Sequence, residues 1–133
     1  MCGGLKDSDK TKRAKDAQIA AEMKRLVTLR QGWVYTWPLA SGYEKRLFGG
    51  HCRIENLDSV WNGKIEKHVK IEASQFSERD TIGGSKELKP FSIPDNKAIH
   101  AVIVNNELRI VTQPSIGEVM KVHHRMPHLV DLY

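Results

Sequence analysis

The sequence predicts an α+β fold, a single domain of mostly antiparallel, curled strands with a basic helix at its N-terminal side. The chain changes character near residue 31, where an alanine- and lysine-rich segment gives way to short β-branched and aromatic runs separated by glycine and proline. A chain of 133 residues is long enough to bury one hydrophobic core. We therefore expect one domain over residues 1–133, with a helix over about 8–30 and a β-rich body over about 31–130.

The first segment has the periodicity of an amphipathic helix. Ser8 or Asp9 can cap its start, and Ile19, Met23, Leu26 and Arg30 recur at helical spacing on one face. Most of its lysines and arginines fall elsewhere on the helix. The helix is expected either to cover one edge of the body as a solvated element or to lie along the phosphates of a nucleic acid.

Short extended runs bounded by turn residues follow this helix. Glycines at positions 83 and 84 predict a turn, and Pro94 interrupts the last run before the hairpin described next. The expected elements are strands over residues 32–37, 47–52 and 69–73, a short helix over 54–61, and an extended run beginning at 91–93.

The clearest local signal is a β-hairpin. Residues 98–104 and 107–112 are two strand-like runs joined by Asn105 and Asn106. Asparagine tolerates the positive φ angles that tight hairpin turns require. The two runs should therefore pair with each other in the fold.

After the hairpin the sequence predicts a short helix and a terminal loop. Ser115 can cap a helical run that continues to Val122. Residues 123–127, which include two adjacent histidines and a proline, should end that helix in a loop.

Composition narrows the class of protein. The net charge of +5 and the pI of about 9.3 favour a polyanionic partner. Two cysteines do not make a disulfide framework, no apolar run approaches the roughly 18 residues of a membrane span, and residues 1–16 are too polar for a signal peptide. We expect a monomer in the reducing cytoplasm with no membrane partner.

The six histidines do not indicate a metal site. Nitrogen and sulfur ligands are available from His51, Cys52, His123, His124 and His128. Their spacing, however, fits no familiar zinc site. We therefore predict neither a metal nor another cofactor.

Cys2 follows Met1 directly. Removal of Met1 would place a thiol and a free α-amine on adjacent carbons, and that pair traps aldehydes. The amine forms an imine and the thiolate then closes a thiazolidine ring. An α-amine titrates near about 8 and a thiol near about 8.5, so both nucleophiles are available near neutral pH.

Several stretches, in the right order and at plausible separations, resemble motifs of one family. Residues 1–3 match a Met-Cys-Gly start, and 122–127 resemble Ile-His-Asp-Arg-Met-Pro. Residues 31–37 resemble Trp-Gly-Leu-Ile-Pro-Ser-Trp, 51–56 resemble Asn-Ala-Arg-x-Glu-Thr, and 73–79 resemble Ala-Asp-Gly-Phe-Tyr-Glu-Trp. The chain resembles the SOS response-associated peptidase (SRAP) family of abasic-site crosslinking proteins, as a short, divergent and possibly phage-type member.

The resemblance implies roles for individual residues. Cys2 would be the crosslinking nucleophile, Glu78 the proton shuttle and His123 the acid–base group that acts on the sugar. His51 stands where the family has asparagine, so its role as a positioning residue is open. Met1 would be removed by the domain itself or by an aminopeptidase.

The resemblance also implies a partner, single-stranded DNA with abasic sites. Arg53 and Arg125 would hold phosphates, and Trp33 and Trp37 would stack on unpaired bases. Gly4 replaces an arginine of the family and removes one phosphate contact. The expected location is the bacterial nucleoid or a phage-infected cell.

Covalent capture and shielding of abasic sites is thus the leading functional hypothesis. The second is a non-enzymatic protein that binds single-stranded DNA or a host component. The third is a cysteine peptidase, a class that needs an oxyanion hole which nothing in the sequence identifies.

Overall fold

The computed structural model describes residues 2–6, 33–38, 44–73 and 75–131, with side chains from Leu47 onward. The predicted helix over about 8–30 lies outside the described residues. The β-rich body is confirmed, since the described chain is built mainly of strands in antiparallel and mixed sheets.

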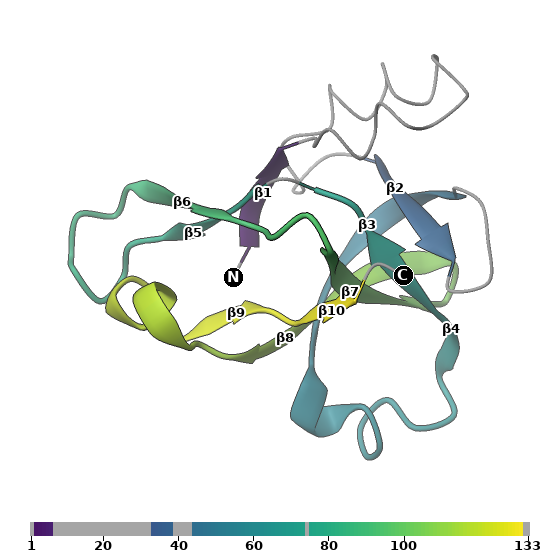
Figure 1. Ribbon diagram of the computed structural model, residues 1–133. Coiled ribbons are helices and arrows are strands. Elements are labelled where there is room, and N and C mark those ends of the chain that lie inside the picture. The colour runs from purple at the N-terminus through teal and green to yellow at the C-terminus, as the bar shows by residue number, and fades with distance from the viewer. Residues whose placement is uncertain (1, 7–32, 39–43, 74, 132–133) are drawn as a thin grey trace.

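Five strands close into a barrel (Figure 1). Around the ring, β7 pairs with β4, β4 with β2, β2 with β3, β3 with β8, and β8 again with β7. Only the pair of β3 and β8 is parallel among these. The strands are β2 (Trp33–Pro38), β3 (Glu44–Arg53), β4 (Ile65–Ile71), β7 (Lys97–Val104) and β8 (Glu107–Pro114).

A separate three-stranded antiparallel sheet lies beside the barrel (Figure 1). Its order is β1 (Cys2–Lys6), β5 (Gln75–Arg79) and β6 (Leu88–Ser92). Two short strands extend the barrel sheet, β9 (Arg125–Pro127) along β8 and β10 (Leu129–Asp131) along β7. The central strand β5 therefore has β1 on one side and β6 on the other.

The predicted hairpin is confirmed. Strands β7 and β8 pair antiparallel from Val104 opposite Glu107 to Ala101 opposite Ile110. Asn105 and Asn106 have φ angles of 51° and 65°, the left-handed conformation that a two-residue hairpin turn requires.

Several predicted elements differ from the observed ones. The expected helix over 54–61 is a single 3₁₀ turn, η2 (Ile54–Asn56), followed by hydrogen-bonded turns. Its apolar residues Ile54, Leu57 and Trp61 pack on the outer face of the barrel without a continuous helical backbone. The strand expected over 69–73 runs from Ile65 to Ile71, and the run expected from 91–93 belongs to β6.

The C-terminal predictions also need correction. The helix expected to start from a Ser115 cap is the 3₁₀ helix η3 (Gly117–Lys121), and its N-cap residue Ile116 makes no side-chain cap bond. Gly117 has a φ of 60°, which breaks the chain direction just after the predicted cap. Part of the predicted loop over 123–127 is strand β9, because it pairs with the end of β8.

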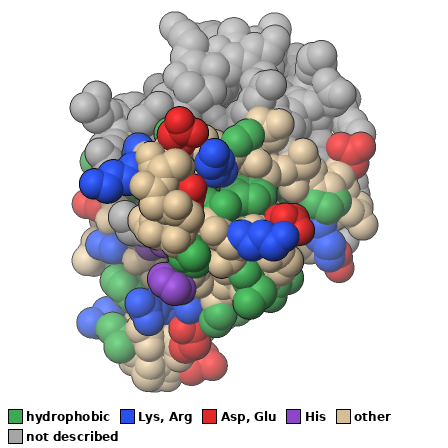
Figure 2. Space-filling view, turned by 90° about the vertical axis from the view of Figure 1, so that its left-hand side faces the viewer, with side chains coloured by type: hydrophobic (Ala, Val, Ile, Leu, Met, Phe, Trp, Pro, Cys, Tyr) green, Lys and Arg blue, Asp and Glu red, His purple; other side chains and the backbone are tan. Residues whose placement is uncertain are grey.

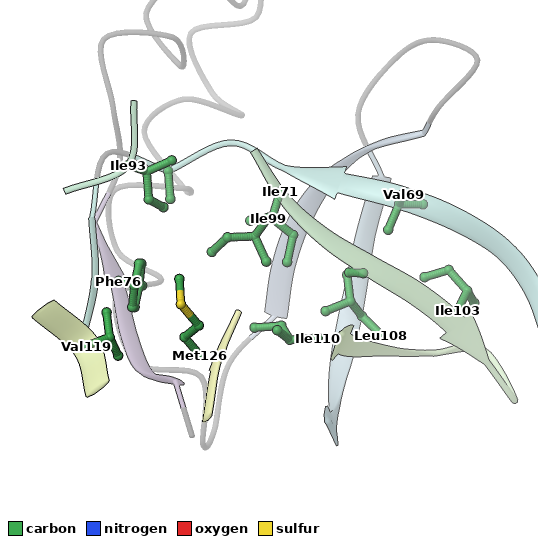
Figure 3. Close-up of a cluster of buried hydrophobic side chains, with 12 residues drawn as sticks. Val69, Ile71, Phe76, Ile93, Ile99, Ile103, Leu108, Ile110, Val119 and Met126 are labelled. Carbon is green, nitrogen blue, oxygen red and sulfur yellow. The ribbon is translucent and has the colours of Figure 1, made fainter. Parts of the chain in front are cut away.

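The main core fills the barrel and continues toward β5 and η3 (Figure 3). Alternate residues of β7 and β8 point into this core, and several of the residues between them are buried on the opposite face. A second cluster lies on the outer face of β7 and β8, beneath the 54–65 segment. The buried residues of the main core are Val69, Ile71, Ala73, Phe76, Ile93, Ile99, Ala101, Ile103, Leu108, Ile110, Val119 and Met126.

Candidate active site

The structure places the backbone of Cys2 directly beside Glu78. Strands β1 and β5 are antiparallel, and Cys2 and Glu78 are Cα partners in their register. Directly opposite residues in such a pair have Cα atoms about 4.5–5.5 Å apart. Two residues far apart in the sequence, both predicted to be catalytic, are therefore strand neighbours.

Glu78 is a fully buried carboxyl group. It lies on the same face of β5 as Phe76, which belongs to the main core, and its exposed fraction is 0%. Burial raises the pKa of Glu78 to about 7, although the positive charge of the amino terminus acts in the opposite direction. Near neutral pH both the acid and the carboxylate are populated, so this group can give and take a proton.

His51 also faces the main core. It lies on β3 opposite Ile110, and its ring meets the Phe48 ring edge-on at a centroid distance of 5.4 Å. Burial, followed by the charges of the amino terminus and Arg109, lowers the pKa of His51 to about 4. The ring is therefore neutral at pH 7, and its buried Nε2 has no hydrogen-bond partner among the described residues.

His123 follows η3 and is held by its own segment. Its backbone N–H donates to the Val119 carbonyl at 2.9 Å, and its Nδ1 lies 3.1 Å from the backbone N–H of Arg125. Burial lowers the pKa of His123, and the charge of the amino terminus lowers it further. The ring is only partly buried.

One charge thus acts on three of the predicted site residues. The amino-terminal positive charge contributes to the pKa shifts of His51, Glu78 and His123. These residues come from β3, β5 and the segment after η3. The amino-terminal charge therefore acts on all three residues, and one of them, Glu78, is also the register partner of Cys2.

Cys52 cannot replace Cys2 as a nucleophile. It is a free cysteine that is 2% exposed. Burial raises the pKa of its thiol to about 11, with the Arg109 charge opposing this rise. The thiolate is the reactive form, so Cys52 is inert near neutral pH.

Arg125 is a bridge between elements. Its two Nη atoms donate to the Glu55 carboxylate at 2.9 and 3.0 Å, and Nη2 also donates to the Thr112 carbonyl at 2.8 Å. The Glu55 pKa is lowered mainly by this hydrogen bond. A phosphate at Arg125 would compete with Glu55. Glu55 lies in the motif over residues 51–56, but the sequence did not predict its contact with Arg125.

The structure gives less information on the other residues predicted to contact DNA, which are Arg53, Trp33 and Trp37. Arg53 ends β3 and is exposed. Trp33 and Trp37 lie on β2, and their side chains lie outside the described part of the structure. On the face shown in Figure 2, basic, acidic and hydrophobic side chains are interspersed rather than gathered by sign.

Sequence analysis missed Arg109. Its guanidinium lies over the Trp61 ring, 4.9 Å from the centroid, and its charge acts on both His51 and Cys52. Trp61 and Cys52 both belong to the second cluster on the outer face. No local motif links these residues, because the contact depends on the register of β8 with β3.

Neither a metal-ligand cluster nor a membrane-spanning helix is found in the part of the chain that the structure describes. Within that part of the chain, no group of three or more histidine, cysteine, aspartate or glutamate side chains is placed to hold a metal ion. The same part contains no helix that is long and apolar enough to cross a membrane.

Comparisons of the chain with protein-family models, with curated proteins and with solved structures find no match. The likeness to the SRAP family therefore rests on the motifs in the sequence itself.

Proposed function

We propose that this chain is a short SRAP-like protein that captures abasic sites in single-stranded DNA through Cys2 and shields them. The observation that carries the proposal is the pairing of Cys2 with Glu78, a buried carboxyl group whose pKa is about 7. A proton-transfer group beside an aminothiol can accelerate the proton transfers of thiazolidine formation.

The chemistry begins with removal of Met1, by the domain or by an aminopeptidase. The freed amine of Cys2 attacks the aldehyde carbon of the opened sugar, and a carbinolamine forms. Glu78 in its carboxylate form takes a proton from the nitrogen and, as the acid, returns it to the departing hydroxyl, so one water leaves and an imine remains. The Cys2 thiolate then adds to the imine carbon, and the nitrogen takes up a proton as the ring closes.

His123 is proposed to act before this step. An abasic deoxyribose is mostly a closed hemiacetal, so its ring oxygen must gain a proton and its anomeric hydroxyl must lose one before the aldehyde exists. An imidazole that titrates below its usual pKa is mainly neutral at pH 7 and can accept the hydroxyl proton. The neutral His51 ring supplies a hydrogen-bonding group at the position of the family's asparagine.

DNA is expected to bind through phosphate contacts and base stacking. Arg53 is exposed and can approach a phosphate without breaking an ion pair recorded among the described residues. Arg125 is expected to contribute only where a phosphate displaces the exposed Glu55 carboxylate, because both Nη atoms bind Glu55 and Nε is buried. Trp33 and Trp37 remain the proposed stacking platforms.

The test is a denaturing gel of the protein with an oligonucleotide that contains one abasic site. The parent protein should give a shifted band that survives denaturation, and Cys2→Ala should give none. A matched oligonucleotide with a tetrahydrofuran analogue, which has no aldehyde, is the substrate control. Reversible binding without any covalent band would instead support the non-enzymatic DNA-binding alternative.

A further inference from the structure

Three histidines from different segments of the chain form a row outside the candidate active site. His68 lies on β4, His100 on β7, and His128 between β9 and β10. His68 Nδ1 is 2.8 Å from His100 Nε2, and His100 Nδ1 is 3.0 Å from His128 Nδ1. The ring centroids are 5.1 and 5.2 Å apart. We call these three residues the histidine row.

The row lies on the outer face of the barrel, where strands β7 and β8 separate. On β7, His100 lies between Ile99 and Ala101, which are both in the main core, so its side chain points outward. The backbone of His128 fills the gap between the strands. His100 N–H donates to the His128 carbonyl at 2.8 Å, and His128 N–H donates to the Val111 carbonyl at 2.8 Å.

The C-terminal strands depend on this junction. Beyond His128, β10 pairs with β7 over only three residues, and Asp131 pairs with Lys97 at 2.6 Å. Before it, β9 pairs with β8 over three residues. Such short pairings have little stability alone, so the row and its backbone bonds fasten the 125–131 segment to the barrel.

The number of protons that the intact row can hold follows from its hydrogen bonds. Each nitrogen–nitrogen contact must contain one proton, because one nitrogen has to donate and the other accept. If His100 is charged, it donates at both contacts and both neighbours must be neutral. If His100 is neutral, it accepts at one contact, and only the neighbour that donates to it there can be charged. The intact row therefore carries at most one positive charge.

Charged side chains of both signs flank the row. On β4, Glu66 and Lys70 lie two residues before and after His68, and the buried Glu72 follows Lys70 at the same spacing. Lys70 is the Cα partner of His100 on β4, and Arg109 lies on β8 opposite Val102, the next outward residue of β7. Lys97 and Asp131 form their ion pair at the far end of the same strands. Burial and the charges of its two neighbours lower the pKa of His100 to about 4, and burial lowers the pKa of His128.

We propose that the histidine row is an acid-sensitive lock, in which uptake of a second proton separates His128 from His100 and releases the 125–131 segment from β7 and β8. The rings contact one another nitrogen to nitrogen, from His68 through His100 to His128. The shared species in this row are protons.

The lock would act on the candidate active site through the chain. Arg125 belongs to the fastened segment and His123 lies two residues before it, so release would free the Arg125 backbone that contacts the His123 ring. The proposal goes beyond the DNA chemistry and does not depend on it.

The test is amide hydrogen exchange of the intact protein by NMR, from pH 7 to pH 5, corrected for the intrinsic pH dependence of exchange. The opening constant at the amides of His100 and His128 should rise by between about 10-fold and 100-fold per pH unit below about pH 6, because one or two more protons bind the open form. Protection at the core residue Val69 should hold over the same range. An opening constant that changes by less than about twofold, or protection lost at Val69 together with His128, would overturn the lock.

Matched variants assign the protons. His100→Gln keeps one donor and one acceptor but does not titrate, so the slope should fall to at most about 10-fold per pH unit. His124→Gln removes an exposed histidine outside the row and should leave the slope as in the parent. Should His100→Gln fail to fold, ring ¹⁵N shifts of the parent decide the question. Two imidazolium rings in the row while the His128 amide stays protected would contradict the proton count.

Discussion

The buried carboxyl group of Glu78 should give the protein a characteristic pH dependence of stability. Its pKa is about 7 in the folded chain, against 4.5 for an unperturbed glutamate. The folded state therefore holds this proton more tightly than the unfolded state does. The stability associated with it is fully present below about pH 4.5 and is lost as the pH rises through 7.

The perturbation is Glu78→Gln, which keeps the shape of the side chain and removes its ionisation. A pKa difference of about 2.5 units, weighted for partial ionisation at the ends of the range, corresponds to about 2.5 kcal/mol between pH 5 and pH 8. The free energy of unfolding of the parent, minus that of the variant, should fall by about this amount over that range.

Urea unfolding at each pH measures this difference, and every other titrating group cancels between the two proteins. Glu118→Gln is the matched control because that side chain is exposed, and its difference from the parent should stay constant. A Glu78→Gln difference that changes by less than about 0.5 kcal/mol from pH 5 to pH 8 would refute the assignment of a buried, proton-binding carboxyl group.

Three further predictions concern the surrounding residues. Arg125→Lys should lower the thermal unfolding midpoint by about 5 °C, because lysine cannot bind Glu55 and the Thr112 carbonyl together. Circular dichroism measures this midpoint, and an unchanged value would contradict the bridging role. His123→Gln should slow single-turnover adduct formation by roughly 10²–10⁴-fold at unchanged DNA affinity, and a rate within about twofold of the parent would remove His123 from the mechanism. Arg53→Gln should reduce the salt slope of reversible DNA binding by about one, measured by fluorescence anisotropy, and an unaltered slope would exclude a phosphate contact there.

Sequence patterns predicted the elements whose formation depends mainly on residues close together in the chain. The hairpin of β7 and β8 followed from two apolar runs around Asn105 and Asn106, because the turn itself specifies the pairing. Strand β5 was missed because Glu78 occupies a buried position where the alternating pattern calls for an apolar side chain. Glu78, the residue proposed for proton transfer, is therefore also the reason why the sequence did not predict β5.

Long-range contacts were beyond sequence analysis for a physical reason. The partners of Arg125 and of His100 are 70 and 32 residues away, and only the register of the strands brings them together. The same holds for Cys2 and Glu78, whose roles came from motif resemblance and whose adjacency came from the pairing of β1 with β5. The spacing of these residues along the chain does not predict their pairing.

The most direct test of the central claim is the intact mass of the adduct with an abasic oligonucleotide, followed by mapping of the linked peptide. The account predicts the mass of the protein without Met1 plus the mass of the oligonucleotide, less one water, with the link at Cys2. An adduct that retains Met1, or a link at a lysine with Cys2 unmodified, would contradict it.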